Sequence, residues 1–254
     1  MSATTCLQLE RHDHVSLLRL NRGANALDVE LMGALDQVLL QLDGAGSPAL
    51  VLASSHPTVF CPGLDLKKLD GCSRQHVREV MESFSVLLRH LAAYSGPTVA
   101  ALAGHAIAGG CLLALACDRR VMARSGARIG LSEINLGIPV PAGAIAMLLA
   151  LYPTRTVEQL VLEGDGFGGE KACELSLVER IAERAAVIEE AVRLANHLAA
   201  RPPTAFAAAK GFLRQGLVDV MRARDDAEQE RFLDLWFDAD TQERVAALVA
   251  TMSH

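Results

Sequence analysis

The stretch that decides the fold reads Gly104-His105-Ala106-Ile107-Ala108-Gly109-Gly110-Cys111-Leu112-Leu113-Ala114, and Ile129-Gly130-Leu131-Ser132-Glu133-Ile134-Asn135-Leu136-Gly137 follows it. Upstream, the short run 98–102 comes after Gly96-Pro97 and is typical of a buried strand. A continuous apolar run, 111–116, comes after Gly109-Gly110. This order predicts a buried strand, then a tight loop, then the start of a helix.

The paired glycines mark a place where a ligand can approach the backbone, because neither residue carries a Cβ atom. The first N–H groups of a helix have no partner inside it and lie at the positive end of its dipole. The N–H of Gly109 is therefore a candidate donor to an anion or a developing oxyanion. A close-packed crossing of helix and strand would use the same glycines, and these residues alone leave both interpretations open.

Two common kinds of chemistry lack their motifs. Gly104 and Gly109 have the spacing of a phosphate-binding loop, but Gly110 and Cys111 stand where that loop needs a lysine and a hydroxyl residue. The chain also contains no G-x-S-x-G sequence. Nucleotide hydrolysis and serine-hydrolase chemistry therefore lose most of their support.

A second loop of the same type lies upstream. The apolar run 49–53 predicts a strand, and Phe60-Cys61-Pro62-Gly63-Leu64-Asp65-Leu66 follows it. Pro62-Gly63 favours an irregular turn, and Asp65 can cap a following helix. The N–H of Leu64 would then be free to face a ligand. Two backbone donors from two strand-to-helix loops would form an oxyanion hole.

These two segments resemble the signature segments of the crotonase (enoyl-CoA hydratase/isomerase) superfamily, and the resemblance extends over most of the chain. It implies an α/β crotonase-like fold, built of coiled βαβ turns with a helical C-terminal region. It also implies an enzyme with an acyl-CoA thioester substrate, in which coenzyme A enters as part of the substrate and no separate cofactor or metal is needed. The N–H groups of Leu64 and Gly109 would hold the thioester oxygen and stabilise an enolate.

The carboxylates separate the reactions of this superfamily. Its hydratases use two glutamates, and Leu112 stands at the first of these positions while Glu133 stands at the second. One base can take a proton from C2 and return it to C4, so this pattern is similar to that of the Δ3,Δ2-enoyl-CoA isomerases. The alternatives are a hydratase, a one-carboxylate C–C lyase or thioester hydrolase, and a non-catalytic acyl-CoA-binding protein.

Glu133 also has a structural interpretation, because it could cap a helix or pair with Arg128 or Arg155. Its apolar neighbours, among them Ile129 and Leu131, instead favour a desolvated base with a raised pKa. The resemblance supports the second interpretation.

The resemblance places further residues against the substrate. Backbone near Ala24 and Ala26 would contact coenzyme A, and Lys67 and Lys68 could meet its phosphates, although a solvated face explains both lysines equally well. The helix over 73–94 would border the acyl group and could select its length through Val80, Phe84 or Leu88. The remaining expected contacts are Pro62, Leu64, Asp65, Leu66, Gly109, Leu112, Leu136, Phe237 and, by analogy only, Lys210.

We expect two regions: residues 1–190 as the core with the coenzyme A and acyl sites, and residues 191–254 as a helical region that covers the site. By analogy with the superfamily, the second region would contribute to a homotrimer or a dimer of trimers. A double proline, Pro202-Pro203, interrupts its helical pattern once.

Composition excludes some partners. The net charge of −6 over 254 residues argues against a nucleic-acid surface. Two stretches without charged residues, 94–117 and 134–154, are interrupted by Gly and Pro, so we expect buried segments and no membrane span. Six cysteines without a C-x-x-C pair, and no secretory signal in residues 1–5, favour reduced thiols in a cytoplasmic protein.

Overall fold

The computed structural model describes residues 6–252, so the N-terminal segment 1–5, in which we expected no secretory signal, lies outside the described residues. In this range the larger sheet has the strand order β1-β2-β3-β5-β7-β10. Its strands are β1 (Leu7–His12), β2 (Val15–Leu20), β3 (Ala49–Ser54), β5 (Thr98–Leu102), β7 (Arg119–Ala123) and β10 (Arg180–Ala182). β1 and β2 form an antiparallel hairpin, and every later pairing is parallel.

A second, smaller sheet has the strand order β4-β6-β8-β9 within the described residues. It consists of β4 (Val59–Cys61), β6 (His105–Ile107), β8 (Ile129–Gly130) and β9 (Gly166–Phe167). β4, β6 and β8 run parallel, whereas β9 pairs antiparallel with β8. Our prediction that the strand at 98–102 leads directly into the Gly109 loop was therefore incomplete, because β6 lies between them. The strands of this smaller sheet are only two or three residues long, which is too short to show a periodic pattern of apolar residues.

The helices of the core cover both sheets, and side chains capping their N-termini explain where several begin. Asp28 accepts from the N–H of Leu31 at the start of α1, and Ser73 accepts from His76 at the start of α3. α4 is buried along its whole length, whereas α8 packs on β3, β5 and β7. These helices are α1 (Val29–Gly44), α2 (Leu66–Leu69), α3 (Arg74–Ala93), α4 (Gly109–Ala116), α5 (Ala142–Leu151), α6 (Thr154–Leu162), α7 (Gly169–Glu174) and α8 (Val187–Ala199), with 3-10 turns η1 (Glu133–Leu136) and η2 (Arg184–Ala186).

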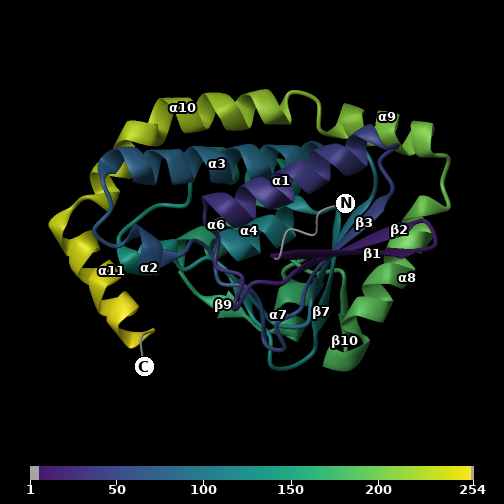
Figure 1. Cartoon of the computed structure of the whole chain (residues 1–254), viewed down its shortest axis with the longest axis horizontal. Coiled ribbons are helices and arrows are strands. Elements are labelled where there is room, and N and C mark those ends of the chain that lie inside the picture. The colour runs from purple at the N-terminus through teal and green to yellow at the C-terminus, as the bar shows by residue number, and fades with distance from the viewer. Residues whose placement is uncertain (1–5, 253–254) are drawn as a thin grey trace.

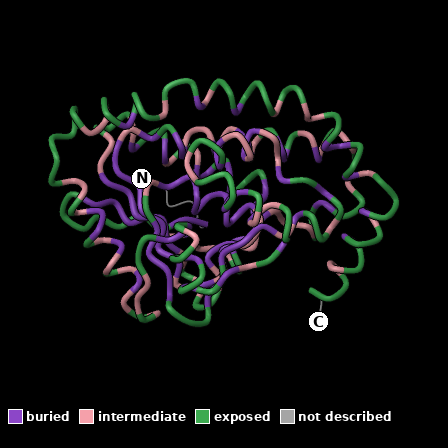
Figure 2. The backbone as a smooth tube through the Cα atoms, turned by 180° about the vertical axis from the view of Figure 1, so that it is seen from behind, coloured by how far each residue is buried: buried purple, intermediate pink, exposed green. Residues whose placement is uncertain are grey.

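The C-terminal helices are α9 (Pro203–Leu213), α10 (Leu217–Trp236) and α11 (Ala239–Thr251). α10 runs along α3 and packs on α5, and α11 then turns down past α2 (Figure 1). Buried residues gather in the strands and inner helices, while the outer face of α10 is exposed (Figure 2). The C-terminal region thus lies against its own chain.

The boundary that we predicted between positions 190 and 191 stays a prediction, although α8 spans it as one continuous helix packed on the larger sheet. A buried cluster ties the following helix, α9, to the core. Lys210 donates to Asp118 at 2.7 Å and to the carbonyl of Gly96, and Arg214 donates to Asp118 at 3.1 Å. Asp118 also accepts from the N–H of Thr98, so this carboxylate joins α9 to the start of β5.

The two uncharged stretches lie inside the core. Residues 98–102 form β5, 109–116 form the buried α4, and 142–151 form α5. Among the helices of the described range, none has the length and hydropathy to span a membrane. All six cysteines fall in that range and are free thiols.

Candidate active site

Three loops of the smaller sheet converge at one end of it. Leu64 follows β4, Gly109 follows β6 and Glu133 follows β8, and these three strands are parallel neighbours in that order. The carboxyl ends of neighbouring parallel strands lie at the same edge of a sheet, so the loops that leave them meet there. This topology brings together residues that are separated by up to 69 positions in the chain.

The loop after β4 leaves one N–H free. Gly63 has a φ of +98°, and its carbonyl accepts from the N–H of Leu27 at 2.8 Å. The N–H of Asp65 donates to the carbonyl of Leu27 at 2.8 Å, and the Asp65 carboxylate caps α2. The N–H of Leu64, between these two bonded residues, has no hydrogen-bond partner within residues 6–252.

The loop after β6 has a strained backbone at Ala108, and this conformation orients the N–H of the next residue, Gly109. Ala108 has φ 51° and ψ −125°, a conformation that costs roughly 1–3 kcal/mol for a residue with a Cβ atom. Its own N–H donates to the carbonyl of Gly130 at 2.9 Å, which holds the loop against β8. The N–H of Gly109, the first residue of α4, has no partner in the described part of the chain.

The two loops touch each other, and glycine is required at both. A Cβ atom on Gly63 would lie 3.0 Å from the Gly109 nitrogen and 2.8 Å from the Ala108 Cβ. A Cβ atom on Gly110 would lie 2.1 Å from the Cys61 carbonyl oxygen, so the start of α4 packs directly on the end of β4. Close packing therefore requires these glycines, and it leaves the N–H of Gly109 facing the cavity, so the two interpretations left open by the sequence do not compete.

Asn25 holds a fourth loop at the site, and the sequence analysis did not single out this residue. Its side chain is fully buried and donates to the Ser54 hydroxyl at 2.8 Å and to the Phe60 carbonyl at 3.1 Å. Its φ of 63° is one that asparagine tolerates better than most residues. The neighbours of Asn25, Ala24 and Ala26, line the cavity described below. The available signal was an asparagine two residues after Gly23, since both residue types favour tight turns.

Glu133 begins η1 and is only 8% exposed. Its Oε2 atom has no hydrogen-bond partner, and it forms no ion pair with Arg128, Arg155 or any other described residue. Burial raises the pKa of Glu133 to about 7, and the backbone N–H groups of Glu133 and Ser132 offset this effect only in part. The carboxylate is thus desolvated and unpaired, as a base that works near neutral pH requires.

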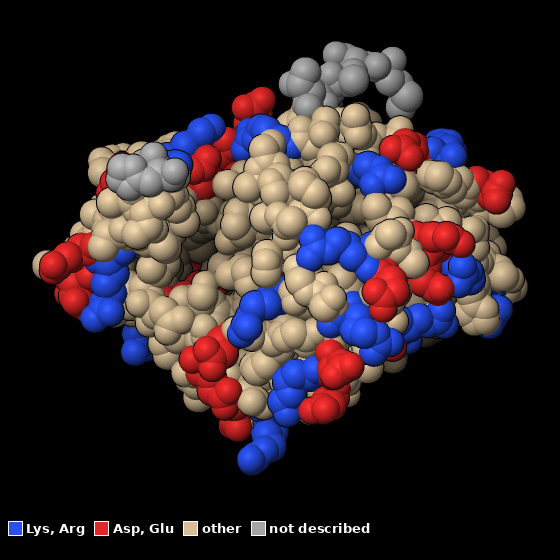
Figure 3. Space-filling view, turned by 90° about the horizontal axis from the view of Figure 1, so that it is seen from below, with Lys and Arg blue, Asp and Glu red and all other residues tan. Residues whose placement is uncertain are grey.

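A cavity of about 610 Å³ joins the three loops. Of the residues expected at the substrate, it is lined by Ala24, Ala26, Pro62, Leu64, Asp65, Leu66, Lys67, Gly109, Glu133 and Leu136. Phe84, one of the three candidate length selectors, also lines it, and Ile138 and Pro139 add to the apolar wall. Viewed from below, the molecule is hollowed beside the C-terminal helix, and uncharged residues form most of the surface around the hollow (Figure 3). We call this space the site cavity.

Several expected residues do not line the site cavity, among them Val80 and Leu88, which are buried in the core. Leu112 is fully buried inside α4 and does not line the site cavity, while Phe237 ends α10 and packs on the core. Their contact with a substrate stays a prediction. The expectation that Lys210 lies beside the substrate is wrong for this chain's own cavity, because Lys210 is buried against Asp118. Lys68 pairs with Asp28, which leaves Lys67 as the lysine on the cavity wall.

The C-terminal helices supply residues of the cavity wall that the sequence analysis did not name. Phe232 and Trp236 of α10, with their rings stacked 6.5 Å apart, line the site cavity together with Leu248 and Met252 from the end of the chain. The Lys67 ammonium group donates to the Met252 carbonyl at 2.7 Å and so joins the mouth of the cavity to the end of α11. The sequence indicated a helical region here, but a helical pattern does not say which residues of it face a distant site.

Two thiols near the site are inert. Cys61 and Cys111 are fully buried, and burial raises the pKa of Cys61 to about 12 and that of Cys111 far above its ordinary range. Both thiols therefore stay protonated near neutral pH and serve as small apolar residues of the core.

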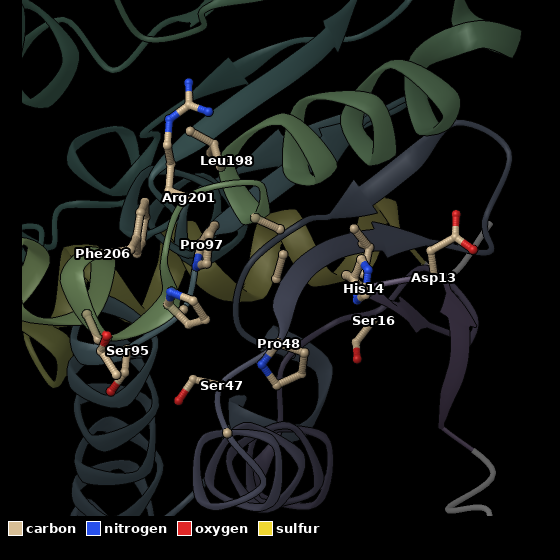
Figure 4. Close-up of a pocket in the computed structure, with 18 of the residues that line it drawn as sticks. Asp13, His14, Ser16, Ser47, Pro48, Ser95, Pro97, Leu198, Arg201 and Phe206 are labelled. Carbon is tan, nitrogen blue, oxygen red and sulfur yellow. The ribbon is translucent and has the colours of Figure 1, made fainter.

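A different cavity, of about 410 Å³, lies at the opposite edge of the larger sheet. It is bordered by the residues that precede β2, β3 and β5, with Ser47, Pro48 and Pro97 around it (Figure 4). Arg201 and Phe206 come from the segment around α9. Ligands of open α/β sheets bind at the carboxyl ends of strands, so this position argues for the site cavity instead.

The arrangement has a definite chemical capacity. Two free N–H groups, of Leu64 and Gly109, stand on one wall, and an unpaired carboxylate with a raised pKa stands in the same apolar space. The N–H groups can hold an oxygen on which negative charge develops, and the carboxylate can remove a proton from a neighbouring carbon.

Comparisons with known proteins agree on the family. The model of the enoyl-CoA hydratase/isomerase family matches residues 10–252. The 2,3-dehydroadipyl-CoA hydratase of Escherichia coli is 31% identical over 96% of this chain and 95% of its own. The structure of enoyl-CoA hydratase from Bacillus halodurans matches with a TM-score of 0.87 at 26% identity, over 95% of this chain and 99% of that one. The human mitochondrial Δ3-Δ2-enoyl-CoA isomerase shares the fold, with a TM-score of 0.92 at 24% identity over 98% of both chains.

Proposed function

The chain belongs to the enoyl-CoA hydratase/isomerase family, and from this premise we propose that it converts a 3-enoyl-CoA into the conjugated 2-enoyl-CoA with Glu133 as its single base. Family membership makes it an acyl-CoA enzyme. The names of its relatives include both hydratases and isomerases, so the reaction must be argued from the residues of this chain.

The observation that carries the proposal is the number of carboxylates available at the reacting carbons. Glu133 and Asp65 are the carboxylates that line the site cavity in the described residues. The Asp65 carboxylate is engaged as the cap of α2, whereas Glu133 has an unpartnered oxygen. Leu112 stands where the hydratases of the superfamily place their other glutamate, and Leu112 is buried and apolar. Hydration needs one group to deprotonate water and another to protonate carbon. An isomerase needs only one group that moves a proton between two carbons, and a single carboxylate can do this.

In the proposed reaction, the N–H groups of Leu64 and Gly109 bind the thioester oxygen. Glu133 takes a proton from C2, and the resulting dienolate carries its negative charge on the bound oxygen. Glu133 then returns the proton to C4, and the double bond moves from C3–C4 to C2–C3. The proton is conserved, and the carboxylate ends the cycle ionised, as it began.

The first experiment offers the protein a 3-enoyl-CoA and, separately, the matching 2-enoyl-CoA, and follows the ultraviolet absorbance of the conjugated thioester. We expect conjugation of the first substrate and little loss of absorbance from the second. Glu133→Gln keeps the shape of the side chain and should lower the rate by about 10²- to 10⁴-fold. Glu158→Gln, on the exposed face of α6, is the matched control and should keep full activity.

Rapid hydration of the 2-enoyl-CoA by the wild type would overturn the isomerase assignment, because a second acid or a well-held water would then be at work. Binding of both thioesters without turnover would favour a non-catalytic acyl-CoA-binding protein. Cleavage of a carbon–carbon bond or of the thioester would favour the lyase or hydrolase alternatives.

A further inference from the structure

The site cavity is separated from a second, larger space by a thin wall. A groove of about 880 Å³ lies between α3, α5 and α10, and we call it the α10 groove. Met81, Pro139, Pro141 and Phe232 line both spaces. The same side chains thus form the end of one space and the beginning of the other.

The α10 groove exists because the middle of α10 is held at a distance by polar contacts. No residue of α10 between 222 and 231 is buried, a span of about 15 Å at 1.5 Å per residue. Instead, Asp225 accepts from the N–H of Gly143 at 2.8 Å and pairs with Arg89 at 3.5 Å, and Gln229 donates to Glu82 at 3.0 Å. These contacts hold α10 above α3 and α5 without filling the space beneath it with apolar side chains.

The lining of the groove suits an uncharged alkyl chain. Leu149, Val220 and Leu235 line it and are 48%, 50% and 38% exposed, respectively, which is costly for large apolar residues that have no partner. The small side chain of Ala146 leaves room on the α5 side. The charged residues on its walls have both signs, so they offer no net attraction to a carboxylate or an ammonium group at the end of a tail.

We propose that the α10 groove receives the tail of long acyl-CoA substrates, which pass from the site cavity between Met81 and Phe232. This inference rests on the proposed function only in that the thioester binds at Leu64 and Gly109. Met81 and Phe232 are buried and line both spaces, so they stand where a tail would pass from one to the other. Methionine adapts its shape readily, and Met81 is the side chain that must move for a tail to pass. The enzyme then prefers long alkyl substrates, with Met81 and Phe232 as the residues that determine length.

The test measures the binding of saturated butanoyl-, octanoyl-, dodecanoyl- and tetradecanoyl-CoA by calorimetry, because these thioesters bind without reacting. Burial of each added CH₂ group strengthens binding by up to about fourfold. We expect affinity to rise by at least about tenfold from octanoyl- to dodecanoyl-CoA. Ala146→Trp fills the groove without touching the site cavity and should abolish this gain, while butanoyl-CoA binding stays unchanged. Leu162→Trp, at an exposed apolar position of α6, is the matched control.

The outcomes separate the two proposals. If butanoyl-CoA binds but affinity stops rising at octanoyl-CoA, or if Ala146→Trp leaves the long-chain gain intact, the groove does not receive the tail. If Ala146→Trp instead lowers the molecular mass found by sedimentation and leaves affinities unchanged, the groove is covered by a second copy of the chain, and the inference is wrong. If none of the thioesters binds, the proposed function fails. Retained binding of butanoyl-CoA by Ala146→Trp shows that this variant is folded, so misfolding cannot explain a loss of the long-chain gain.

Discussion

At the scale of single residues, the site is defined by groups that have been left without partners. The N–H groups of Leu64 and Gly109 and the Oε2 of Glu133 have none within the described range. Unpaired buried polar groups cost roughly 1–3 kcal/mol each and are rare in folded proteins. Their concentration around one apolar cavity is what a binding site for a polar, reacting group requires.

The raised pKa of Glu133 predicts how activity depends on pH. The base works only when it is ionised, and its pKa is about 7 because burial disfavours the charge. The kcat/KM of the isomerisation should therefore rise about tenfold per pH unit below pH ~7 and level off above it. Initial rates measured from pH 5 to 9 check this. A flat profile across that range would show that Glu133 is not the titrating base.

Gly63 predicts how sensitive the N–H donors are to backbone position. Gly63→Ala places a Cβ atom 3.0 Å from the Gly109 nitrogen at a φ of +98°, so this loop must shift. Loss of one oxyanion donor costs about 10²- to 10³-fold in kcat, and we expect a loss of this order. Gly33→Ala is the control, because a Cβ atom there meets nothing within 4 Å and α1 gains helix propensity. Equal activities of the two variants in steady-state assays would contradict the assigned donor geometry.

At the scale of elements, the sequence predicted long segments well and short ones poorly. The helix that we expected over 73–94 is α3 (Arg74–Ala93), and the expected helical region after position 190 contains α9, α10 and α11. β4, β6 and β8 escaped detection because their pairing with one another, and not a local pattern, makes them strands. The convergence of Leu64, Gly109 and Glu133 was thus inferred from a family resemblance, and residue spacing alone could not have supplied it.

The contact between α10 and α5 carries a prediction at this scale. Asp225 is half-buried, caps the start of α5 through the N–H of Gly143, and pairs with Arg89. Asp225→Ala should lower the free energy of unfolding by about 1–3 kcal/mol, because a charged hydrogen bond at a helix N-terminus is lost. Asp226→Ala, at the exposed next residue, should change it by less than about 0.5 kcal/mol. Chemical denaturation would reveal the difference, and equal values for both variants would show that Asp225 does not anchor α10.

At the scale of the whole molecule, the C-terminal region returns to cover the site of its own chain. Phe232, Trp236, Leu248 and Met252 reach the site cavity from helices that begin after position 216. The sequence indicated a helical region that covers a site, but it did not indicate whether that site belongs to the same chain or to another copy. The path of α10 depends on contacts with α3 and α5, which lie far away in the chain. The apolar cavity that these helices help to wall encloses Glu133, and burial raises its pKa.

This enclosure should lower the stability of the molecule at high pH. The folded protein holds the Glu133 proton up to a pKa of about 7, whereas the ordinary value is 4.5. The unfolded chain loses the proton first, so stability falls as pH rises from about 4.5 to 7. Glu133→Gln removes this cost and should raise the free energy of unfolding at pH 8 by up to about 3 kcal/mol. Denaturation would measure this gain at both ends of the pH range. An equal gain in the free energy of unfolding at pH 4 and pH 8 would exclude burial of the ionised Glu133 as its cause.

The central claim is that one carboxylate carries one proton from C2 to C4. The most direct measurement uses a 3-enoyl-CoA with deuterium at C2, in ordinary water, and locates the label in the product by mass spectrometry and nuclear magnetic resonance. Because Glu133 is only 8% exposed, its proton should exchange slowly with solvent. We predict that a substantial fraction of the product carries deuterium at C4, and that Glu133→Gln forms almost no product. Conjugated product with no deuterium at C4, or a hydrated product in its place, would contradict the single-base account.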